Sequence, residues 1–380
     1  MLENWSFITS VKPFLQKAWE KSGFEKPTAI QMKAAPLVLE GVDIIAESPT
    51  GTGKTLAYLL PLLEQIDPEA KGTRAIILAP SRELVMQIYE QVQKWTENSG
   101  IGKASFIGGA NVKRQIEKLK KRPQIVVGTP GRVLELIRLK KLKMHEVKSI
   151  VMDEGDQLLV PEHMNTIKDI IKATLRDRQL LVFSATLPEK TEQQARELSE
   201  NAELIRIGRG KANESNTRHN YVVCDAREKV DILGKIMRLE PEKVLVFVRD
   251  IGNLSVLSEK LKYKGFSLDV LHSEAKKTDR AAALKNFREG KCSLLITTDV
   301  AARGLDIQGL THVIQFDPPE NADQYIHRSG RTGRSGASGT VISIVAPREE
   351  RVLKQFSREL NIPVHQKVLY KGKMMDKAEK

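Results

Sequence analysis

The chain has 380 residues, which is enough for two or three domains that each bury a core of their own. Its formal net charge of +13 and its isoelectric point near 9.5 favour a polyanionic partner, nucleic acid before an acidic membrane, and leave plain solubility charge as the alternative. The apolar runs are too short to span a membrane and the first residues lack the basic and apolar parts of a secretion signal, so we expect a cytoplasmic protein without a membrane anchor.

The first informative segment, residues 48–55, reads Ser-Pro-Thr-Gly-Thr-Gly-Lys-Thr between an apolar run and a helix-like run. A strand, a glycine loop and a helix together form a phosphate cradle, because backbone N–H groups and the helix N-terminus face the anion. The related motif G-x-x-x-x-G-K-[ST] has glycine where this chain has Ser48, so a structural turn is the alternative. On the functional interpretation Lys54 reaches the outer phosphates and Thr55 binds Mg²⁺. The other positions of the cradle are Thr50, Gly51, Thr52 and Gly53.

Apolar, strand-like runs alternate with helix-like segments along the chain. Continuous β-branched runs between helices indicate buried parallel strands, so we predict an α/β fold with doubly wound sheets. The predicted strands are 75–78, 125–127, 150–152 and 180–183 in the first half, and 221–223, 244–247, 294–296 and 313–314 in the second. Cys224 and Cys292 stand far apart in such runs, so we expect buried thiols rather than a disulfide or a metal site.

The alternation stops at residues 208–216, which are polar, contain glycine and carry no large apolar side chain. This composition predicts a linker between two α/β domains. We therefore divide the chain into a first domain at 1–207, a second domain at 217–364 and a short basic tail at 365–380. We expect the tail to be a frayed, solvated end, with RNA binding as the alternative.

Two carboxylates, Asp153 and Glu154, follow the predicted strand 150–152. In doubly wound sheets the carboxyl ends of the strands face the ligand crevice. We therefore predict that Asp153 binds Mg²⁺ through water and that Glu154 orients and deprotonates an attacking water, with an ordinary turn as the alternative.

Residues 153–156, Asp-Glu-Gly-Asp, resemble the signature tetrapeptide of DEAD-box ATP-dependent RNA helicases, with Gly155 where that family has alanine. Both residues are small, so we expect the change to be tolerated, although glycine could loosen the turn that holds Asp156. The resemblance extends from Phe7 to roughly Val345 and keeps the family's motif order. It implies an α/β protein with two tandem RecA-like domains, each a mainly parallel sheet flanked by helices.

Residues 24–31 resemble the family's adenine-sensing motif, with Phe7 as the upstream aromatic residue. The resemblance implies that the amide of Gln31 reads adenine and that Phe24 stacks on the base. Packing in the core is the alternative for Phe24.

Residues 327–334, His-Arg-Ser-Gly-Arg-Thr-Gly-Arg, hold three arginines and two glycines, and this composition predicts a surface. The resemblance implies that Arg331 and Arg334 reach the γ-phosphate as arginine fingers and that Asp306 binds the ribose. The catalytic groups Lys54 and Glu154 then lie on one domain and the arginines on the other, so hydrolysis requires closure. The residues implied to couple the domains are Asp156, Ser184, Thr186 and His327.

Several hydroxyl, glycine and arginine positions resemble the family's RNA motifs, which hold phosphates without reading sequence. The implied RNA-binding residues are Pro80, Ser81, Arg82, Gly109, Thr129, Gly131, Arg132, Arg280 and Thr298. Near Arg280, Lys277 and Ser273 replace a glutamine and a glycine of the family, which leaves the detailed RNA grip of the second domain open.

The helix after Arg132 bears Arg138, Lys140 and Lys141 and would be the wedge that bends one RNA strand. A solvated helix face is the alternative for these three residues.

Together the motifs predict an ATP-dependent RNA helicase that hydrolyses ATP on RNA binding and locally separates short RNA duplexes or remodels RNA–protein complexes. ATP and Mg²⁺ are the implied cofactors, and single-stranded RNA or a short duplex is the implied partner. We expect a monomer, and the resemblance suggests that it acts in ribosome biogenesis on pre-ribosomal particles or in low-temperature RNA remodelling. Two alternatives stay open: an RNA clamp that closes on ATP but barely turns over, and a DNA helicase or protein-remodelling ATPase of the same build.

Overall fold

The computed structural model describes residues 6–208, 217–302, 307, 309–333 and 337–377. The chain divides into two compact units, an N-terminal unit at Met1–Gly210 and a C-terminal unit at Lys211–Lys380. The predicted linker 208–216 lies, apart from Gly208, outside the described residues, so its role and the domain boundaries remain predictions.

The N-terminal unit contains a sheet of seven strands in the order β3-β4-β2-β5-β6-β1-β7. Every neighbouring pair in this sheet is parallel, as the continuous apolar runs predict. In chain order the strands are β1 (Ile44–Glu47), β2 (Ala75–Leu78), β3 (Lys103–Phe106), β4 (Ile125–Gly128), β5 (Ser149–Asp153), β6 (Gln179–Ser184) and β7 (Glu203–Arg206).

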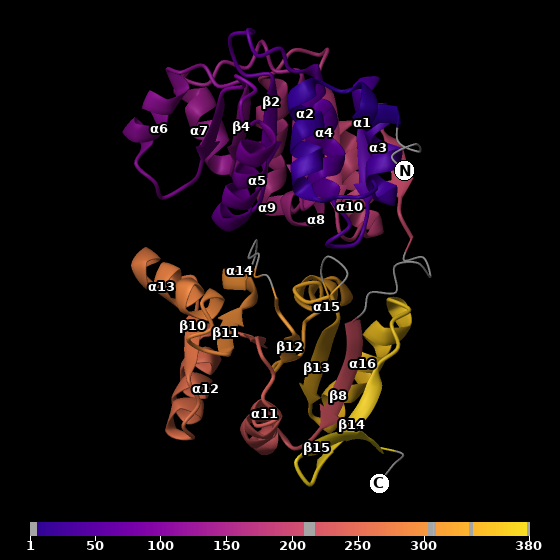
Figure 1. The fold of residues 1–380 in the computed structure, drawn as a ribbon, viewed down its shortest axis with the longest axis vertical. Helices are drawn as coiled ribbons and strands as arrows, with labels where there is room; N and C mark the ends of the chain where they lie inside the picture. The colour runs from indigo at the N-terminus through magenta and orange to yellow at the C-terminus, as the bar shows by residue number, and fades with distance from the viewer. Residues whose placement is uncertain (1–5, 209–216, 303–306, 308, 334–336, 378–380) are drawn as a thin grey trace. The chain divides into compact units, whose positions relative to one another are not determined.

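Helices cover both faces of this sheet (Figure 1). Side chains on one face join a core with α1 (Ser6–Ser10), α2 (Pro13–Ser22), α3 (Ala29–Leu39), α4 (Lys54–Gln65) and α5 (Arg82–Trp95). Side chains on the other face join a second core with α6 (Val112–Leu119), α7 (Pro130–Arg138), α8 (Gly155–Leu158), α9 (Pro161–Lys172) and α10 (Glu189–Leu198). Because successive strand residues point to opposite faces, Val151 belongs to the first core and its neighbours Ile150 and Met152 to the second.

The C-terminal unit contains an eight-stranded sheet in the order β10-β11-β9-β12-β13-β8-β14-β15, and only the pair β14–β15 is antiparallel. Its strands are β8 (Thr217–Val223), β9 (Val244–Val248), β10 (Leu268–Leu271), β11 (Leu294–Thr298), β12 (His312–Gln315), β13 (Gly339–Val345), β14 (His365–Tyr370) and β15 (Lys373–Asp376). Its helices are a 3₁₀ turn at Ala226–Glu228, α11 (Lys229–Met237), α12 (Ile251–Tyr263), α13 (Lys277–Arg288), α14 (Asp299–Ala302), α15 (Ala322–Ser329) and α16 (Pro347–Glu359).

The end of the chain differs from the prediction of a frayed tail, which is wrong for residues 365–376. These residues form the hairpin β14–β15, and β14 pairs with β8. Leu369 and Met374 pack against the core of the C-terminal unit, and Lys367 forms an ion pair with Asp376 at 2.7 Å. The apolar residues form two short runs, 368–370 and 374–375, among lysines, and this polar composition hid the residues that pack on the core.

None of the described helices is both long and apolar enough to pass through a membrane.

Candidate nucleotide and RNA site

The strand order of the N-terminal unit brings two groups of predicted residues to one edge of its sheet. The strands β5, β6 and β1 are neighbours, and their carboxyl ends lead to Asp153, Ser184 and the loop 48–55. The strands β3, β4 and β2 are also neighbours, and Gly109, Thr129 and Ser81 follow their carboxyl ends. The nucleotide-type residues and the RNA-type residues of this unit therefore occupy adjacent stretches of one edge.

The loop 48–55 connects β1 to α4, as predicted for a phosphate cradle. Gly51 and Gly53 have φ of 78° and 86°, a left-handed conformation that favours glycine. A Cβ atom at Gly53 would lie 2.5 Å from Nε2 of Gln31, so this position has no room for a side chain. The Lys54 ammonium donates hydrogen bonds to the carbonyl oxygens of Ser48 and Pro49, the latter at 2.9 Å.

Ser48, which departs from the simple glycine pattern, has a structural role in this loop. It is fully buried, and its Oγ lies 2.7 Å from Oγ1 of Thr52. Thr52 also donates to the Pro49 carbonyl at 2.7 Å. These hydroxyl contacts tie the two ends of the loop together, so the missing glycine does not weaken the interpretation of the loop as a cradle.

The predicted adenine-sensing residues lie beside this loop. Gln31 is 3% exposed, its Oε1 accepts from the N–H of Thr28 at 3.0 Å, and its Nε2 donates to the Gly53 carbonyl at 3.3 Å. Phe24 stacks on Trp95 with ring centroids 6.5 Å apart and contacts Trp19 at 5.5 Å, yet it remains 47% exposed. The Phe24 ring therefore has one packed face and one face open for contact.

Asp153 ends β5 as a buried carboxylate with two hydrogen bonds. Oδ2 accepts from the Tyr58 hydroxyl at 2.8 Å, and Oδ1 accepts from the N–H of Glu154 at 3.0 Å. Burial raises the pKa of Asp153 to about 6, and the hydrogen bond from Tyr58 opposes this rise. The charge of Glu154 raises the same pKa, whereas the charge of Lys54 lowers it. The carboxylate is thus held in one orientation near neutral pH.

Tyr58 was not predicted from the sequence. It lies on α4 three residues after Thr55 and is fully buried, and its hydroxyl also hydrogen-bonds the Thr55 side chain. Burial and the charge of Asp153 raise the pKa of Tyr58 well above its ordinary value. The hydroxyl therefore stays protonated and donates a hydrogen bond to Asp153. A tyrosine one helical turn after the threonine, in an otherwise aliphatic run, is the only sequence feature that could have indicated it.

Glu154 has a backbone conformation that side chains rarely adopt, with φ 54° and ψ 56°. Its Oε2 is buried and has no hydrogen-bond partner among the described residues. A buried carboxylate oxygen without a donor costs stability, so it requires an explanation such as a bound water or ligand.

The predicted coupling residues of the N-terminal unit contact one another. Ser184 Oγ donates to Asp156 Oδ1 at 2.6 Å, Thr186 Oγ1 lies 3.3 Å from Asp156 Oδ2, and the N–H of Asp156 lies 3.2 Å from Ser184 Oγ. These bonds hold the turn in which we expected glycine at position 155 to be tolerated. A Cβ atom at Gly155 would lie 2.7 Å from Cγ1 of Val182, so the glycine leaves the space that Val182 occupies.

The RNA-type residues of the N-terminal unit are packed around the loop before α6. A Cβ atom at Gly109 would lie 2.4 Å from Nη2 of Arg82, so the Arg82 guanidinium rests against this glycine. Ser81 caps α5 by accepting from the N–H of Leu84 at 3.1 Å. Arg132 is 7% exposed and donates to the Ala110 carbonyl at 3.1 Å, so it supports this loop.

Other RNA-type residues lie at the starts of helices. Pro80 precedes α5, Thr129 is the residue before α7, and Gly131 is exposed in the first turn of α7. The predicted wedge differs from expectation, because α7 ends at Arg138 and the lysines at 140 and 141 lie beyond the helix.

In the C-terminal unit the arginine-rich segment is not the open surface that its composition predicts. Arg328 is 2% exposed, forms two hydrogen bonds with Asp299 at 2.7 and 2.6 Å, and lies over the Phe247 ring at 5.2 Å. Arg331 is 7% exposed, and its Nε donates to the His327 carbonyl at 3.2 Å. The surface prediction was wrong for Arg328 and Arg331, and for Arg328 the reason is that Asp299, distant in sequence, supplies a partly buried counter-charge.

The remaining predicted residues of this unit lie outside the segment 327–333. Thr298 ends β11 and is buried, and Arg280 lies on α13 and donates to the His272 carbonyl at 3.2 Å. Asp306 and Arg334, with the side chain of Lys277, lie outside the described residues.

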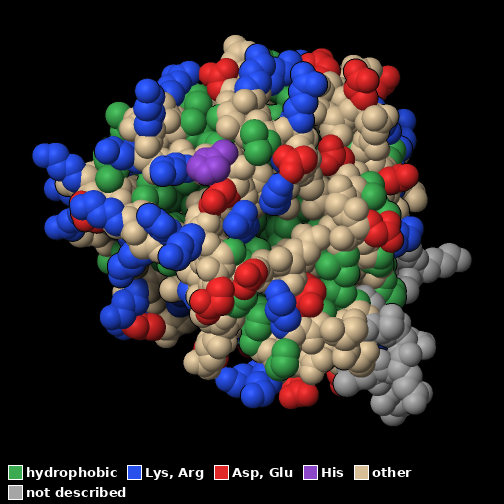
Figure 2. Space-filling model, turned by 90° about the horizontal axis from the view of Figure 1, so that it is seen from above, with side chains coloured by type: hydrophobic (Ala, Val, Ile, Leu, Met, Phe, Trp, Pro, Cys, Tyr) green, Lys and Arg blue, Asp and Glu red, His purple; other side chains and the backbone are tan. Residues whose placement is uncertain are grey.

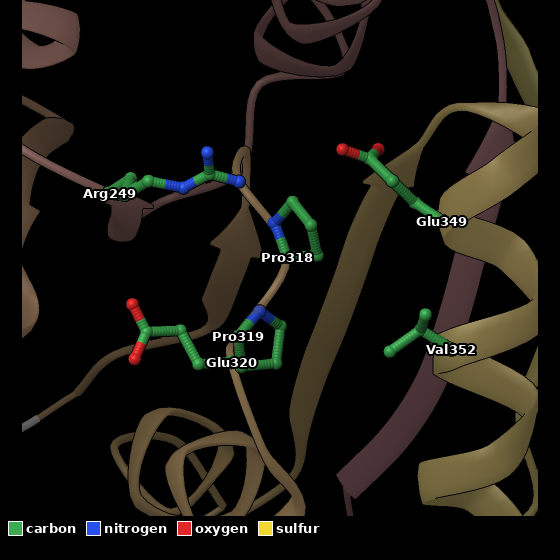
Figure 3. Close-up of a pocket in the computed structure, with 6 residues that line it drawn as sticks. All are labelled: Arg249, Pro318, Pro319, Glu320, Glu349 and Val352. Atoms are coloured by element: carbon green, nitrogen blue, oxygen red, sulfur yellow. The ribbon is translucent and has the colours of Figure 1, made fainter.

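Two cavities lie away from all these positions. One, of about 330 Å³, is in the C-terminal unit, where Figure 3 shows Arg249 and Glu349 on opposite sides of Pro318 and Pro319. The other, of about 680 Å³, lies in the N-terminal unit beside Arg74, at the amino ends of β2, β5 and β6. None of the predicted site residues lines either cavity.

The sequence matches two family models. Residues 28–195 match the DEAD/DEAH box helicase family, and residues 228–336 match the helicase conserved C-terminal domain. The chain is 56% identical to the probable ATP-dependent RNA helicase YfmL of Bacillus subtilis, over 99% of this chain and 100% of that protein. It is 52% identical to the DEAD-box ATP-dependent RNA helicase CshC of Bacillus cereus, over 98% of this chain and 96% of that protein.

Solved structures give the same result. The structure of S. cerevisiae Dbp5 bound to RNA and ADP BeF₃ has a TM-score of 0.87 and 32% identity, and covers 95% of this chain and 94% of that one. A structure of Mss116p bound to ssRNA and AMP-PNP has a TM-score of 0.83 and 26% identity, and covers 95% of this chain and 78% of that one. The two parallel sheets flanked by helices, the family matches and the relatives agree: the chain consists of two RecA-like domains and belongs to the DEAD-box family of ATP-dependent RNA helicases.

Proposed function

We propose that this helicase holds ATP on the N-terminal unit, with the base near Phe24 and Gln31 and the phosphates in the loop 50–55. The contact between Gln31 and Gly53 supports this assignment, because it links the predicted base-sensing side chain to the predicted phosphate loop at 3.3 Å. The left-handed glycines leave backbone N–H groups of the loop available to an anion.

Mg²⁺ is the metal that these residues fit. It takes oxygen ligands, keeps several waters and is held by few protein groups, in line with the hydroxyl of Thr55 and the carboxylate of Asp153. The buried, unpartnered Oε2 of Glu154 next in the chain adds an acceptor for a metal-bound or free water. When bound, the ion neutralises phosphate charge. The hydrogen bond from Tyr58 would fix the orientation of the Asp153 carboxylate that holds such an ion.

Glu154 is the proposed general base, and its buried Oε2 is the observation that carries the proposal. Removal of the proton from an attacking water needs a carboxylate that protein donors have not already occupied. The strained backbone of Glu154 supports the same role, because such strain persists where surrounding structure holds a functional side chain in place.

We further propose that Arg331 and Arg334 of the C-terminal unit complete the site when RNA binds, and that Asp156, Ser184, Thr186 and His327 transmit this event. Guanidinium groups suit charge spread over phosphoryl oxygens, so their arrival lowers the barrier to hydrolysis. The RNA-type residues then hold a strand by its phosphates, and local separation of a short duplex follows from binding one strand in preference to two.

The substitution Glu154→Gln tests the proposed base. It keeps the size of the side chain but removes its capacity to take a proton. RNA-stimulated ATP turnover is expected to fall by about 10²- to 10⁴-fold, whereas the affinity for a fluorescent ATP analogue stays within a few-fold of the unmodified chain. Unchanged turnover in this variant would mean that another group activates the water.

Multiple-turnover phosphate release by the unmodified chain, with and without RNA, separates the helicase from an ATP-dependent RNA clamp. Competition between matched RNA and DNA strands tests the preference for RNA, because only RNA carries the 2′-hydroxyl.

The cellular role is a proposal that rests on resemblance. We propose a monomeric, cytoplasmic enzyme that acts on pre-ribosomal RNA. Crosslinking the chain to cellular RNA and sequencing the adducts tests the target, and light scattering in solution tests the monomer.

A further inference from the structure

Two strongly basic segments of the N-terminal unit extend beyond the predicted site, although Arg138, Lys140 and Lys141 in the second segment belong to the predicted wedge. Residues 111–122 contain six lysines and arginines and one glutamate, and residues 138–148 contain five and one. All eleven cationic side chains are exposed. They are Lys113, Arg114, Lys118, Lys120, Lys121, Arg122, Arg138, Lys140, Lys141, Lys143 and Lys148, and we call them the basic flank.

The basic flank lies on one face of the sheet. Apolar residues of α6 and α7 pack against the same core, and β3 and β4, which precede these helices, are neighbours in the sheet. Figure 1 accordingly draws α6 and α7 next to each other. Lysine and arginine side chains are numerous on the left of Figure 2, the side on which Figure 1 draws these two helices.

Acidic neighbours neutralise only a part of this charge. Lys120 pairs with Glu117 at 2.8 Å, Arg138 pairs with Asp169 at 2.9 Å, and Lys148 pairs with Asp177. The other members have no ion-pair partner within the described parts of the chain. Because clustered like charges repel, this concentration does not stabilise the fold and instead attracts a polyanion.

The basic flank starts beside the RNA-type residues, at the start of α6, and extends from there toward the amino ends of β4 and β5, where most of its members lie. The helix α6 starts three residues after Gly109, against which the Arg82 guanidinium rests. At the start of α7, Arg132 donates to the Ala110 carbonyl in the same loop. The helix α6 is about 12 Å long at 1.5 Å per residue, so the flank extends the basic surface well beyond this loop.

We propose that the basic flank binds the phosphate backbone of RNA that continues beyond the strand held by the RNA-type residues. This inference rests on the RNA-helicase function. The segments 111–122 and 138–148 contain no Phe, Tyr or Trp, the residues that interfaces with proteins favour. Most cations of the basic flank are lysines, which contact phosphate as point charges without reading sequence. A flanking contact of this kind would raise the affinity for long RNA without changing the chemistry of ATP.

The test compares the full chain with the variant Lys113→Gln/Lys118→Gln/Lys121→Gln/Lys143→Gln, whose four lysines were not predicted to contact RNA. Affinity is measured for a single strand of about 8 nucleotides and for the same strand extended by about 12 nucleotides at its 5′ or its 3′ end, between about 50 and 200 mM salt. For the extended RNA the variant is expected to bind at least about tenfold more weakly at low salt, with a salt slope of log K smaller by about 3. For the short RNA, affinity and stimulated ATP turnover are expected to match the full chain.

A matched control carries the same charge change elsewhere in this unit: Lys17→Gln/Lys33→Gln/Lys71→Gln/Lys94→Gln. Three of these exposed lysines lie on α2, α3 and α5, which cover the other face, and Lys71 lies in the loop before β2. The control is expected to keep its preference for the extended RNA.

The proposal is wrong if the extension adds no affinity to the full chain, which would leave an acidic protein or solubility as the reason for the charge. It is also wrong if the control loses as much as the variant. If short RNA does not stimulate ATP turnover by the full chain, the result instead contradicts the helicase function itself.

Discussion

Tyr58 shows how one side chain sets the geometry of the predicted metal site. Its hydroxyl donates to Oδ2 of Asp153, and the backbone of Glu154 donates to Oδ1. Both oxygens keep a further lone pair for a metal-bound water, because a carboxylate accepts about four hydrogen bonds. The tyrosine therefore orients the carboxylate without consuming its capacity.

The substitution Tyr58→Phe removes this donor and little else. The pKa of Asp153 is then expected to rise further, since the bond from Tyr58 opposes the effect of burial. A hydrogen bond to a charged group contributes about 1.5–3 kcal/mol, so the Mg²⁺ concentration for half-maximal nucleotide binding is expected to rise by about tenfold or more. Equilibrium titration with a fluorescent nucleotide measures it. Tyr89→Phe, on α5, is the control and should leave the Mg²⁺ requirement unchanged.

Gly155 and Val182 form a complementary pair, because a methyl group at 155 would overlap Cγ1 of Val182 at 2.7 Å. Gly155→Ala is therefore expected to lower the unfolding free energy by about 1–3 kcal/mol and to weaken the contact of Asp156 with Ser184. Val182→Ala opens the space, so the double variant should recover RNA-stimulated turnover that Gly155→Ala loses. Urea unfolding and ATP turnover measure the two effects. If the double variant is no better than Gly155→Ala, the two side chains do not compete for space.

At the scale of elements, the strands were predictable because each is a continuous apolar run between helices. Ala75–Leu78 and Gln179–Ser184 are examples in which pattern and structure agree. The hairpin 365–376 was not predictable in the same way. Its apolar residues form only two short runs among lysines, and the strand that it pairs with, β8, lies more than a hundred residues earlier in the chain.

The hairpin makes a prediction at this scale. Leu369 is partly buried against the core, whereas Tyr370 is 47% exposed. Leu369→Ala is expected to lower the unfolding free energy by about 1–2 kcal/mol, less than for a fully buried leucine, and Tyr370→Ala by less than that. Denaturant unfolding of the full chain, followed by fluorescence, measures both. Equal effects of the two substitutions would mean that residues 365–376 do not pack as a hairpin on the sheet.

At the scale of the whole molecule, the proposed site depends on residues from both units. Arg331→Ala is expected to lower RNA-stimulated ATP hydrolysis by roughly three to five orders of magnitude, as for other arginine fingers, while ATP affinity changes little. Arg331 is buried and donates to the His327 carbonyl, so its removal can also affect folding. The thermal unfolding of the Arg331→Ala variant must therefore be compared with that of the unmodified chain. Normal turnover in a folded Arg331→Ala chain would show that the N-terminal unit hydrolyses ATP without it.

The parts of the site that were predictable from the sequence are those whose residues are contiguous in the chain. The loop 48–55 and the carboxylates at 153 and 154 were found from residue type and order alone. The contacts of Tyr58 with Asp153 and of Arg328 with Asp299 were missed, because each joins two ordinary-looking residues that only the fold brings together. The residue types gave no reason to pair them.

The ion pair between Arg328 and Asp299 has one more consequence. Asp299 directly follows Thr298, a residue that we expect to face RNA. Arg328 directly follows His327, which we expect to face the other unit. It also lies three residues before Arg331, which we expect to face the nucleotide. The bidentate bond between the buried Arg328 and the partly exposed Asp299 joins the start of α14 to α15. We therefore expect a displacement of Thr298 to shift α15, the helix that leads to Arg331.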